Sequence, residues 1–86
     1  MRTQTFMLPE FWASYFVNGD ASGYTTRDLD QMNSFENYMV GVYGACWCLD
    51  VAIDFGDDFR AHHDATEFGV LACNVVEFTF DISGEN

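Results

Sequence analysis

The spacing of apolar residues changes halfway along this chain, and the change limits the fold to a mixture of helices and strands. In the first half, apolar residues recur about four positions apart, which places them on one face of a helix. In the second half they alternate with other residues, as in strands whose successive side chains point to opposite faces. The helical set is Phe11, Trp12, Tyr15 and Phe16, followed by Leu29, Met32, Phe35 and Met39. The alternating set is Ala45, Trp47, Leu49, Val51 and Ile53, followed by Val70, Ala72, Asn74, Val76, Phe78, Phe80 and Ile82.

Local signals bound these elements. Pro9 fits the first position of a helix, where its missing N–H is not needed. Asn18 and Gly19 predict the end of that helix, because both residues tolerate left-handed backbone geometry. Thr25 and Asp28 predict a capping box at the start of the second helix, with Asp in place of the usual Glu or Gln. Further strands are predicted at 3–7 and 59–64, and loops or turns at 54–58 and 65–69.

The predicted fold class is α+β. Two short helices pack on one face of a three- to four-stranded antiparallel sheet, and the short loops of the second half favour a meander. The chain of 86 residues is expected to form a single domain, residues 1–86. No run of residues approaches the ~18 apolar positions of a membrane span, so we expect no membrane partner.

The chain is strongly acidic, with 14 Asp and Glu against three Arg, no Lys and a formal net charge of −11. Because 49% of its residues are hydrophobic and 17% aromatic, a folded core is predicted rather than disorder. A field of one sign repels nucleic acid and attracts a basic protein surface, which is therefore the predicted partner. A solvated surface that gives solubility, or adaptation to high salt, would produce the same charge.

The acids that we predict to bind this partner form two clusters. The primary cluster is carried by loops and strand ends of the second half, and the secondary cluster by the polar side of the second helix. Their carboxylates would occupy Arg and Lys sites that normally hold phosphates, helped by bidentate pairing with Arg. The primary cluster is Asp54, Asp57, Asp58, Asp64 and Glu67, of which the first three are the best candidates, and the secondary cluster is Asp28, Asp30 and Glu36.

The segment Asn18-Gly19-Asp20-Ala21-Ser22-Gly23 resembles the start of a calcium-binding EF-hand loop. The pattern then fails, because the twelfth position, which should supply a bidentate Glu, is Leu29. A helix-capping turn explains the same residue types. We therefore expect a turn here rather than a calcium site.

The cysteines and histidines raise two further possibilities, a metal site and a catalytic pair. Cys46 and Cys48 lack the spacing of a zinc knuckle, and small buried cysteines explain them equally well. Cys73 could approach His62 or His63 across neighbouring strands, but the acidic surroundings would keep its thiol unreactive. We expect no metal, no cofactor and no enzymatic activity, and the odd number of cysteines fits a reducing cytoplasm.

Two groups of motifs are distributed along the chain. The first group is Leu8-Pro9-Glu10-Phe11-Trp12-Ala13-Ser14-Tyr15 and Asn18-Gly19-Asp20-x-Ser22-Gly23. The second is Cys48-Leu49-Asp50-Val51, His63-Asp64-Ala65, Gly69-Val70-Leu71-Ala72-Cys73-x-Val75 and Phe78-Thr79-Phe80. In this order the motifs resemble a family of small proteins commonly encoded by phages, prophages and plasmids. The resemblance implies an accessory gene of a mobile element, and acidic proteins of that kind include anti-CRISPR and anti-restriction inhibitors, many of which act as DNA mimics.

Charge and resemblance together predict an inhibitor of a host defence complex. It would act in the host cytoplasm, as a monomer or small homo-oligomer, by covering a basic surface of a CRISPR or restriction complex subunit. The alternative is an accessory binding module, also not an enzyme, that uses an aromatic-rich face including Phe11, Trp12 and Tyr15 for an apolar contact. A salt-insensitive complex would favour that alternative.

Overall fold

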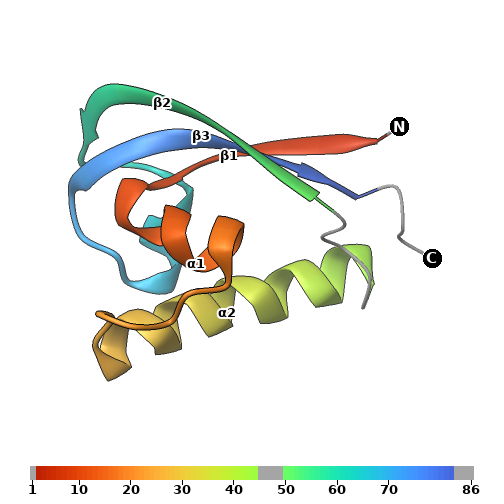
Figure 1. Ribbon diagram of the computed structural model, residues 1–86, viewed down its shortest axis with the longest axis horizontal. Helices are drawn as coiled ribbons and strands as arrows, with labels where there is room; N and C mark the ends of the chain where they lie inside the picture. Colours follow the sequence, from red (N-terminus) through yellow and green to blue (C-terminus); the bar gives the residue numbers. More distant parts are fainter. Residues whose placement is uncertain (1, 45–49, 83–86) are drawn as a thin grey trace.

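Two helices cover one face of an antiparallel sheet in the computed structural model, which describes residues 2–44 and 50–82 (Figure 1). This arrangement confirms the α+β class. The strands are β1 (Thr3–Pro9), β2 (Asp50–Arg60) and β3 (Cys73–Asp81). The helices are α1 (Ala13–Asn18) and α2 (Thr26–Tyr43), and two short 3₁₀ helices are η1 (Glu10–Trp12) and η2 (Asp64–Phe68). In the part of the chain that the structure describes, no helix is long and apolar enough to cross a bilayer.

The strand order is β1-β3-β2, and β3 pairs antiparallel with both neighbours. Phe78 of β3, for example, lies opposite Phe6 of β1 on one side and Ile53 of β2 on the other. The order differs from that of a simple meander, because β1 and β2 take the two edges. The strand with the longest alternating pattern thus takes the central position, where both of its edges are hydrogen-bonded.

β2 runs through the segment where the sequence predicts a turn. Asp54 lies opposite Glu77 and Asp58 opposite Val75, so β2 advances four residues while β3 advances two. The residues between Asp54 and Asp58 therefore form a β-bulge, an irregularity that Gly and Asp accommodate as readily as a turn. The predicted turn at 54–58 is wrong for this reason.

The chain reverses direction after β2 rather than within it. The strand predicted at 59–64 ends at Arg60, and the loop predicted at 65–69 belongs largely to η2. Residues 45–49 of the strand predicted at 45–53 lie outside the described residues.

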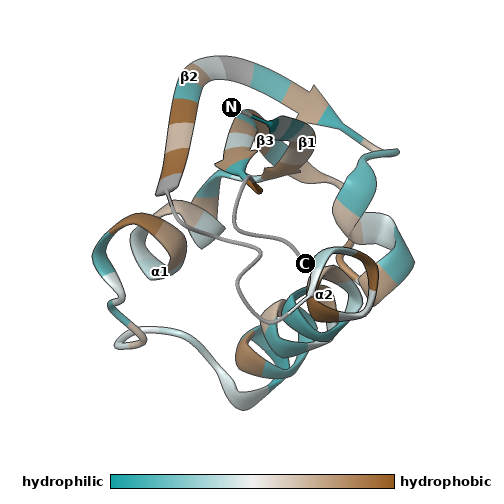
Figure 2. Cartoon of the chain, turned by 90° about the vertical axis from the view of Figure 1, so that its right-hand side faces the viewer, coloured by the Kyte–Doolittle hydropathy of each residue, from teal (hydrophilic) through white to brown (hydrophobic). Residues whose placement is uncertain are grey.

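The core lies between the sheet and the two helices. Inward-facing residues of β3 meet one face of α2, and Phe35 is at the centre, with ring centroids 5.6 Å from Phe6, 5.8 Å from Trp12 and 5.9 Å from Phe80. In Figure 2, hydrophobic and hydrophilic residues interchange along the helices and strands. The fully buried large side chains include Leu8, Trp12, Met32, Phe35, Met39, Val75, Val76, Phe78, Phe80 and Ile82.

The predicted end of the first helix and the predicted start of the second are confirmed, whereas the predicted helix start at Pro9 is wrong by one residue. The Thr25 hydroxyl accepts a hydrogen bond from the Asp28 backbone N–H at 3.1 Å, and the Asp28 carboxylate accepts one from the Thr25 backbone N–H at 3.0 Å. This is the predicted capping box of α2. Gly19 ends α1 in the left-handed conformation, with a φ of 68°. Pro9 is the last residue of β1, so the helical segment begins one residue later, at Glu10.

Candidate interaction surface

No helix of the described residues lies on the face of the sheet opposite α1 and α2 (Figure 1), and most of its side chains are at least partly exposed, with Val75 a buried exception. Buried Val76, Phe78 and Phe80 point toward the helices, so the residues that alternate with them point away. The register continues these outward positions across β1 and β2. We call this surface the open face, and it consists of Thr3, Thr5, Met7, Ala52, Asp54, Glu77, Thr79 and Asp81.

An acidic pair lies on the open face. Asp54 and Glu77 are both exposed and stand directly opposite each other on β2 and β3. Cβ atoms in such positions are about 5 Å apart, and like charges there are destabilising. Within residues 2–44 and 50–82, neither carboxylate has a hydrogen-bonding or charged partner. The two carboxylates therefore repel each other across the strands, and no described residue offsets this repulsion.

Asp54 is among the acids predicted from the sequence, but Glu77 is not. The alternation of the last strand already places Glu77 on the side opposite Val76 and Phe78. What the sequence does not contain is the register, which alone puts Glu77 next to Asp54. Asp81, four residues further along β3, belongs to the same face and was also missed.

The bulge of β2 also carries exposed aromatic side chains at the edge of the sheet. Phe59 stands opposite Asn74, which alternates with Glu77's side of β3, so this ring lies on the side of the sheet away from the acidic pair. Phe55 is 63% exposed and Phe59 is 67% exposed, although both belong to a strand. Between them lies Asp58, which forms an ion pair with Arg60 at 2.8 Å. Asp57 also belongs to this bulged segment. Three of the predicted primary acids, Asp54, Asp57 and Asp58, are thus close together in β2.

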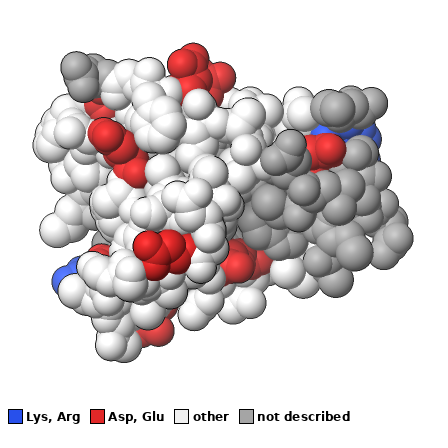
Figure 3. Space-filling view, viewed as in Figure 1, with Lys and Arg blue, Asp and Glu red and all other residues white. Residues whose placement is uncertain are grey.

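The secondary cluster lies on the other layer of the molecule. Asp28, Asp30 and Glu36 belong to α2, below the sheet in Figure 1. Glu36 accepts a hydrogen bond from the Tyr15 hydroxyl at 2.8 Å, and this bond, with burial and the nearby charge, raises the pKa of Tyr15. Figure 3 shows acidic side chains scattered over both layers rather than gathered in one patch. The two predicted clusters therefore do not form one face.

Asp64 and Glu67 lie on η2, away from the β2 acids. The Asp64 carboxylate accepts a hydrogen bond from the backbone N–H of Met7 at 2.6 Å. Met7 belongs to β1, an edge strand, so Asp64 satisfies a donor that would otherwise be open to strand pairing. Asp64 therefore stabilises the edge of β1. Glu67 is exposed.

Cys73 and His63 approach each other as the sequence suggested, with 3.7 Å between Sγ and Nε2. The same Nε2 lies 3.2 Å from the Leu71 carbonyl oxygen. Because a carbonyl only accepts, Nε2 carries the proton and is not a base for the thiol in this geometry. Burial also raises the pKa of the Cys73 thiol. The arrangement does not activate the cysteine, and His62 is exposed and outside this contact.

The calcium-like segment forms a local turn. The Asp20 carboxylate accepts hydrogen bonds from the Ser22 hydroxyl at 2.6 Å and from the Ser22 backbone N–H at 2.9 Å, and both lower the pKa of Asp20. No group of three His, Cys, Asp or Glu side chains in the described ranges could hold a metal ion. Cys46 and Cys48 lie outside these ranges.

No protein-family model, curated protein or solved structure matches this chain. The resemblance to proteins of mobile elements stays a prediction. The geometry and charge of the open face are therefore the observations that bear on function.

Proposed function

We propose that this chain is a binding protein, not an enzyme, that docks its open face onto a basic surface used by another protein to bind nucleic acid. The observation that carries the proposal is the acidic pair of Asp54 and Glu77. Both are exposed and lack a partner within the described residues, and they face each other on the uncovered side of the sheet.

A partner arginine would remove the repulsion within this pair. Its planar guanidinium presents five donors and pairs bidentately with carboxylates as it does with phosphates. Binding of an arginine at Asp54 and Glu77 is therefore favoured twice. The arginine attracts both carboxylates, and it also removes the repulsion between them that is present in the unbound protein. This makes the pair a better binding site than acids already engaged within the fold, such as Glu36 and Asp64.

The proposed interface extends from the open face around the β2 edge to the exposed Phe55 and Phe59. Aromatic residues at the centre of an interface, with charged groups around them, carry a large share of binding energy. Both rings are exposed in the bulged segment of the edge strand β2, and Phe59 stands in register with Asn74 on the side of the sheet opposite the acidic pair. A partner that contacts both groups would therefore wrap around the β2 edge. The proposed surface thus combines carboxylates that imitate phosphates with apolar anchors that a nucleic acid backbone lacks.

The structure favours this surface over the aromatic face of the first helical segment. Trp12 of that face is fully buried, and Tyr15 and Phe16 pack against the core. Phe11 alone is substantially exposed, at 42%. Most of that aromatic set is therefore occupied inside the fold.

The biological setting follows from the resemblance to proteins of mobile elements. We propose that the partner is a subunit of a CRISPR or restriction complex in the host cytoplasm, and that covering its DNA- or RNA-binding surface inhibits the complex. The chain would then act as a DNA mimic, and duplex DNA should compete with it for the same partner.

The test is capture and competition with basic proteins of a bacterial lysate. Proteins that bind DNA-cellulose are passed over the immobilised chain at low salt, and bound proteins are displaced with duplex DNA. The expected result is that one or a few nucleic-acid-binding proteins are retained and then released by DNA. Retention that DNA does not reverse would contradict mimicry.

A matched pair of double variants locates the site. Asp54→Asn with Glu77→Gln removes the acidic pair, whereas Asp30→Asn with Glu67→Gln removes one Asp and one Glu that are exposed away from the open face. Both double variants change the net charge equally. Loss of capture in the first and not in the second is expected. Equal loss in both would show that only the overall charge matters.

A further inference from the structure

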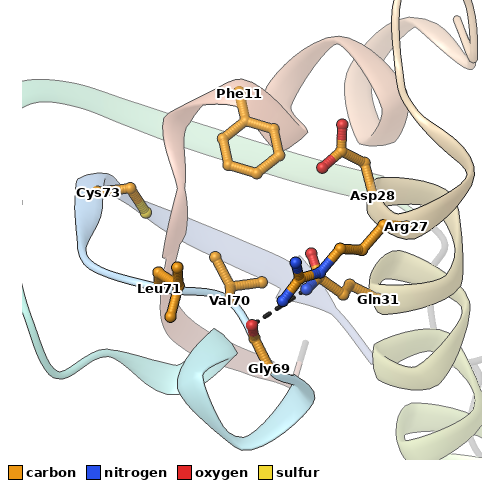
Figure 4. Close-up of a pocket in the computed structure, with 8 residues that line it drawn as sticks. All are labelled: Phe11, Arg27, Asp28, Gln31, Gly69, Val70, Leu71 and Cys73. Atoms are coloured by element: carbon orange, nitrogen blue, oxygen red, sulfur yellow. Dashed lines mark hydrogen bonds between the residues drawn. The ribbon is translucent and has the colours of Figure 1, made fainter.

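A groove opens at the end of the sheet where β1 ends and β3 begins (Figure 4). One pocket of about 240 Å³ lies between α2, η1 and the chain before β3. A second pocket of about 350 Å³ shares Phe11 and Cys73 with it, so the two are adjacent, and we call them together the groove. The groove is separate from the open face and does not depend on the proposed function.

The groove wall formed by residues 69–71 is held in place by hydrogen bonds. The Gln31 side-chain amide donates to the Gly69 carbonyl at 3.1 Å, and the Val70 backbone N–H donates to the Ala65 carbonyl at 3.3 Å. His63 Nε2 donates to the Leu71 carbonyl at 3.2 Å. A wall fixed before binding loses little conformational freedom when a ligand enters.

The lining is mainly apolar. The Phe11 ring faces the pocket from one side and Leu71 and Val70 lie on the other, with the Cys73 thiol at one end (Figure 4). Leu71 is 75% exposed and Phe11 is 42% exposed. Large apolar side chains left open around a concavity are a common property of ligand sites.

One cation and one anion lie at the edge of this apolar pocket. Arg27 and Asp28 are neighbours in the first turn of α2, and both line it. Arg27 makes no hydrogen bond or ion pair with any other described residue, whereas Arg60 is held by Asp58. Asp28 uses Oδ2 to accept from Thr25, which leaves Oδ1 available.

We propose that the groove binds a free α-amino acid with an aliphatic or aromatic side chain. The ligand carboxylate pairs with Arg27, its ammonium group pairs with Asp28, and its side chain packs against Phe11 and Leu71. Such a ligand carries no net charge, so it is not repelled by the formal net charge of −11 on the chain. An apolar carboxylate would meet that repulsion, and an apolar amine would leave Arg27 unpaired.

The test is an NMR titration of the full chain with L-phenylalanine. Saturable shifts are expected for the backbone amides of Gly69, Leu71 and Cys73. Phenylacetate, phenethylammonium and N-acetyl-L-phenylalaninamide each lack one or both charges, and each should bind at least about tenfold more weakly, since a hydrogen bond to a charged group is lost. Absence of saturable shifts at millimolar L-phenylalanine would overturn the proposal, as would equal binding by any of the three analogues.

Two arginine variants separate the site from a general charge effect. Arg27→Gln should weaken L-phenylalanine binding at least about tenfold. Arg60→Gln is an equal charge change on β2, and it should leave the affinity within about twofold, because Arg60 pairs with Asp58 and does not line either pocket, although it stands opposite Cys73 in the register. The dispersion of each amide spectrum reports whether the variant is folded. Equal affinities in the two folded variants would contradict the role of Arg27.

Discussion

Individual acidic residues have different structural roles in this molecule. The Asp64 carboxylate binds the backbone of an edge strand, Asp28 caps α2, and Asp20 closes a turn. Asp54 and Glu77 do none of these things and instead face each other. A role for an individual acid therefore follows from its surroundings and not from its contribution to the net charge.

Asp64→Ala should lower the free energy of unfolding by about 1 kcal/mol, because the Met7 N–H at the edge of β1 loses its acceptor. Asp64→Asn should retain most of the stability, since its amide oxygen can still accept that bond. Urea unfolding of both variants measures the difference. If alanine and asparagine were equally destabilising, the hydrogen bond would not be the cause.

Cys73 should react slowly with alkylating reagents. Burial raises the pKa of its thiol, so at pH 8 a smaller fraction is the reactive thiolate than in free cysteine. The rate of iodoacetamide modification can be read in a Cys46→Ser, Cys48→Ser background that leaves Cys73 as the one thiol. A rate above that of free cysteine at pH 8 would instead indicate an activated nucleophile.

Elements with a strong local signal were predicted well from the sequence. α2 has both a capping box and the helical spacing of Met32, Phe35 and Met39, and β3 alternates regularly from Val76 to Phe80. β2 was predicted poorly, because Asp-Phe-Gly-Asp-Asp is compatible with both a turn and a bulge. The choice between them is made by pairing with β3, which is distant in sequence and leaves no local mark.

The capping box makes a measurable contribution to α2. Thr25→Ala should lower the free energy of unfolding by about 1 kcal/mol, because the Asp28 backbone N–H loses its side-chain acceptor. Thr25→Ser keeps the hydroxyl and should stay close to the wild-type stability. Thermal unfolding followed by circular dichroism compares the two, and equal losses would show that the threonine methyl group matters rather than the cap.

Part of the candidate site was also predictable. The sequence identified Asp54, Asp57 and Asp58 because they are close in the chain, and the structure keeps them in one segment of β2. It could not identify Glu77, because 23 positions separate it from Asp54 and only the sheet register brings the two together. For the same reason it grouped α2 acids with the site, although α2 lies on the other layer.

On the scale of the whole molecule, the acidic pair should lower stability in the absence of a partner. Replacing it with Asp54→Asn and Glu77→Gln should raise the free energy of unfolding by about 0.2–1 kcal/mol, the usual size of a cross-strand pair effect. Added salt screens the same repulsion, so the wild type should gain more from salt than the variant does. Asp30→Asn with Glu67→Gln controls for the change in overall charge, and equal stabilisation by both double variants would mean that the pair has no special effect.

The most direct test of binding through the open face is the salt dependence of affinity for the captured basic protein. We expect the wild-type affinity to fall steeply between about 0.05 and 0.5 M NaCl, as for proteins that pair charges with a polyanion-binding surface. Asp54→Asn with Glu77→Gln should bind at least about tenfold more weakly at low salt, with a shallower slope, while Asp30→Asn with Glu67→Gln stays within about twofold of the wild type. An affinity that does not change with salt, or that falls equally in both double variants, would contradict the proposed interface.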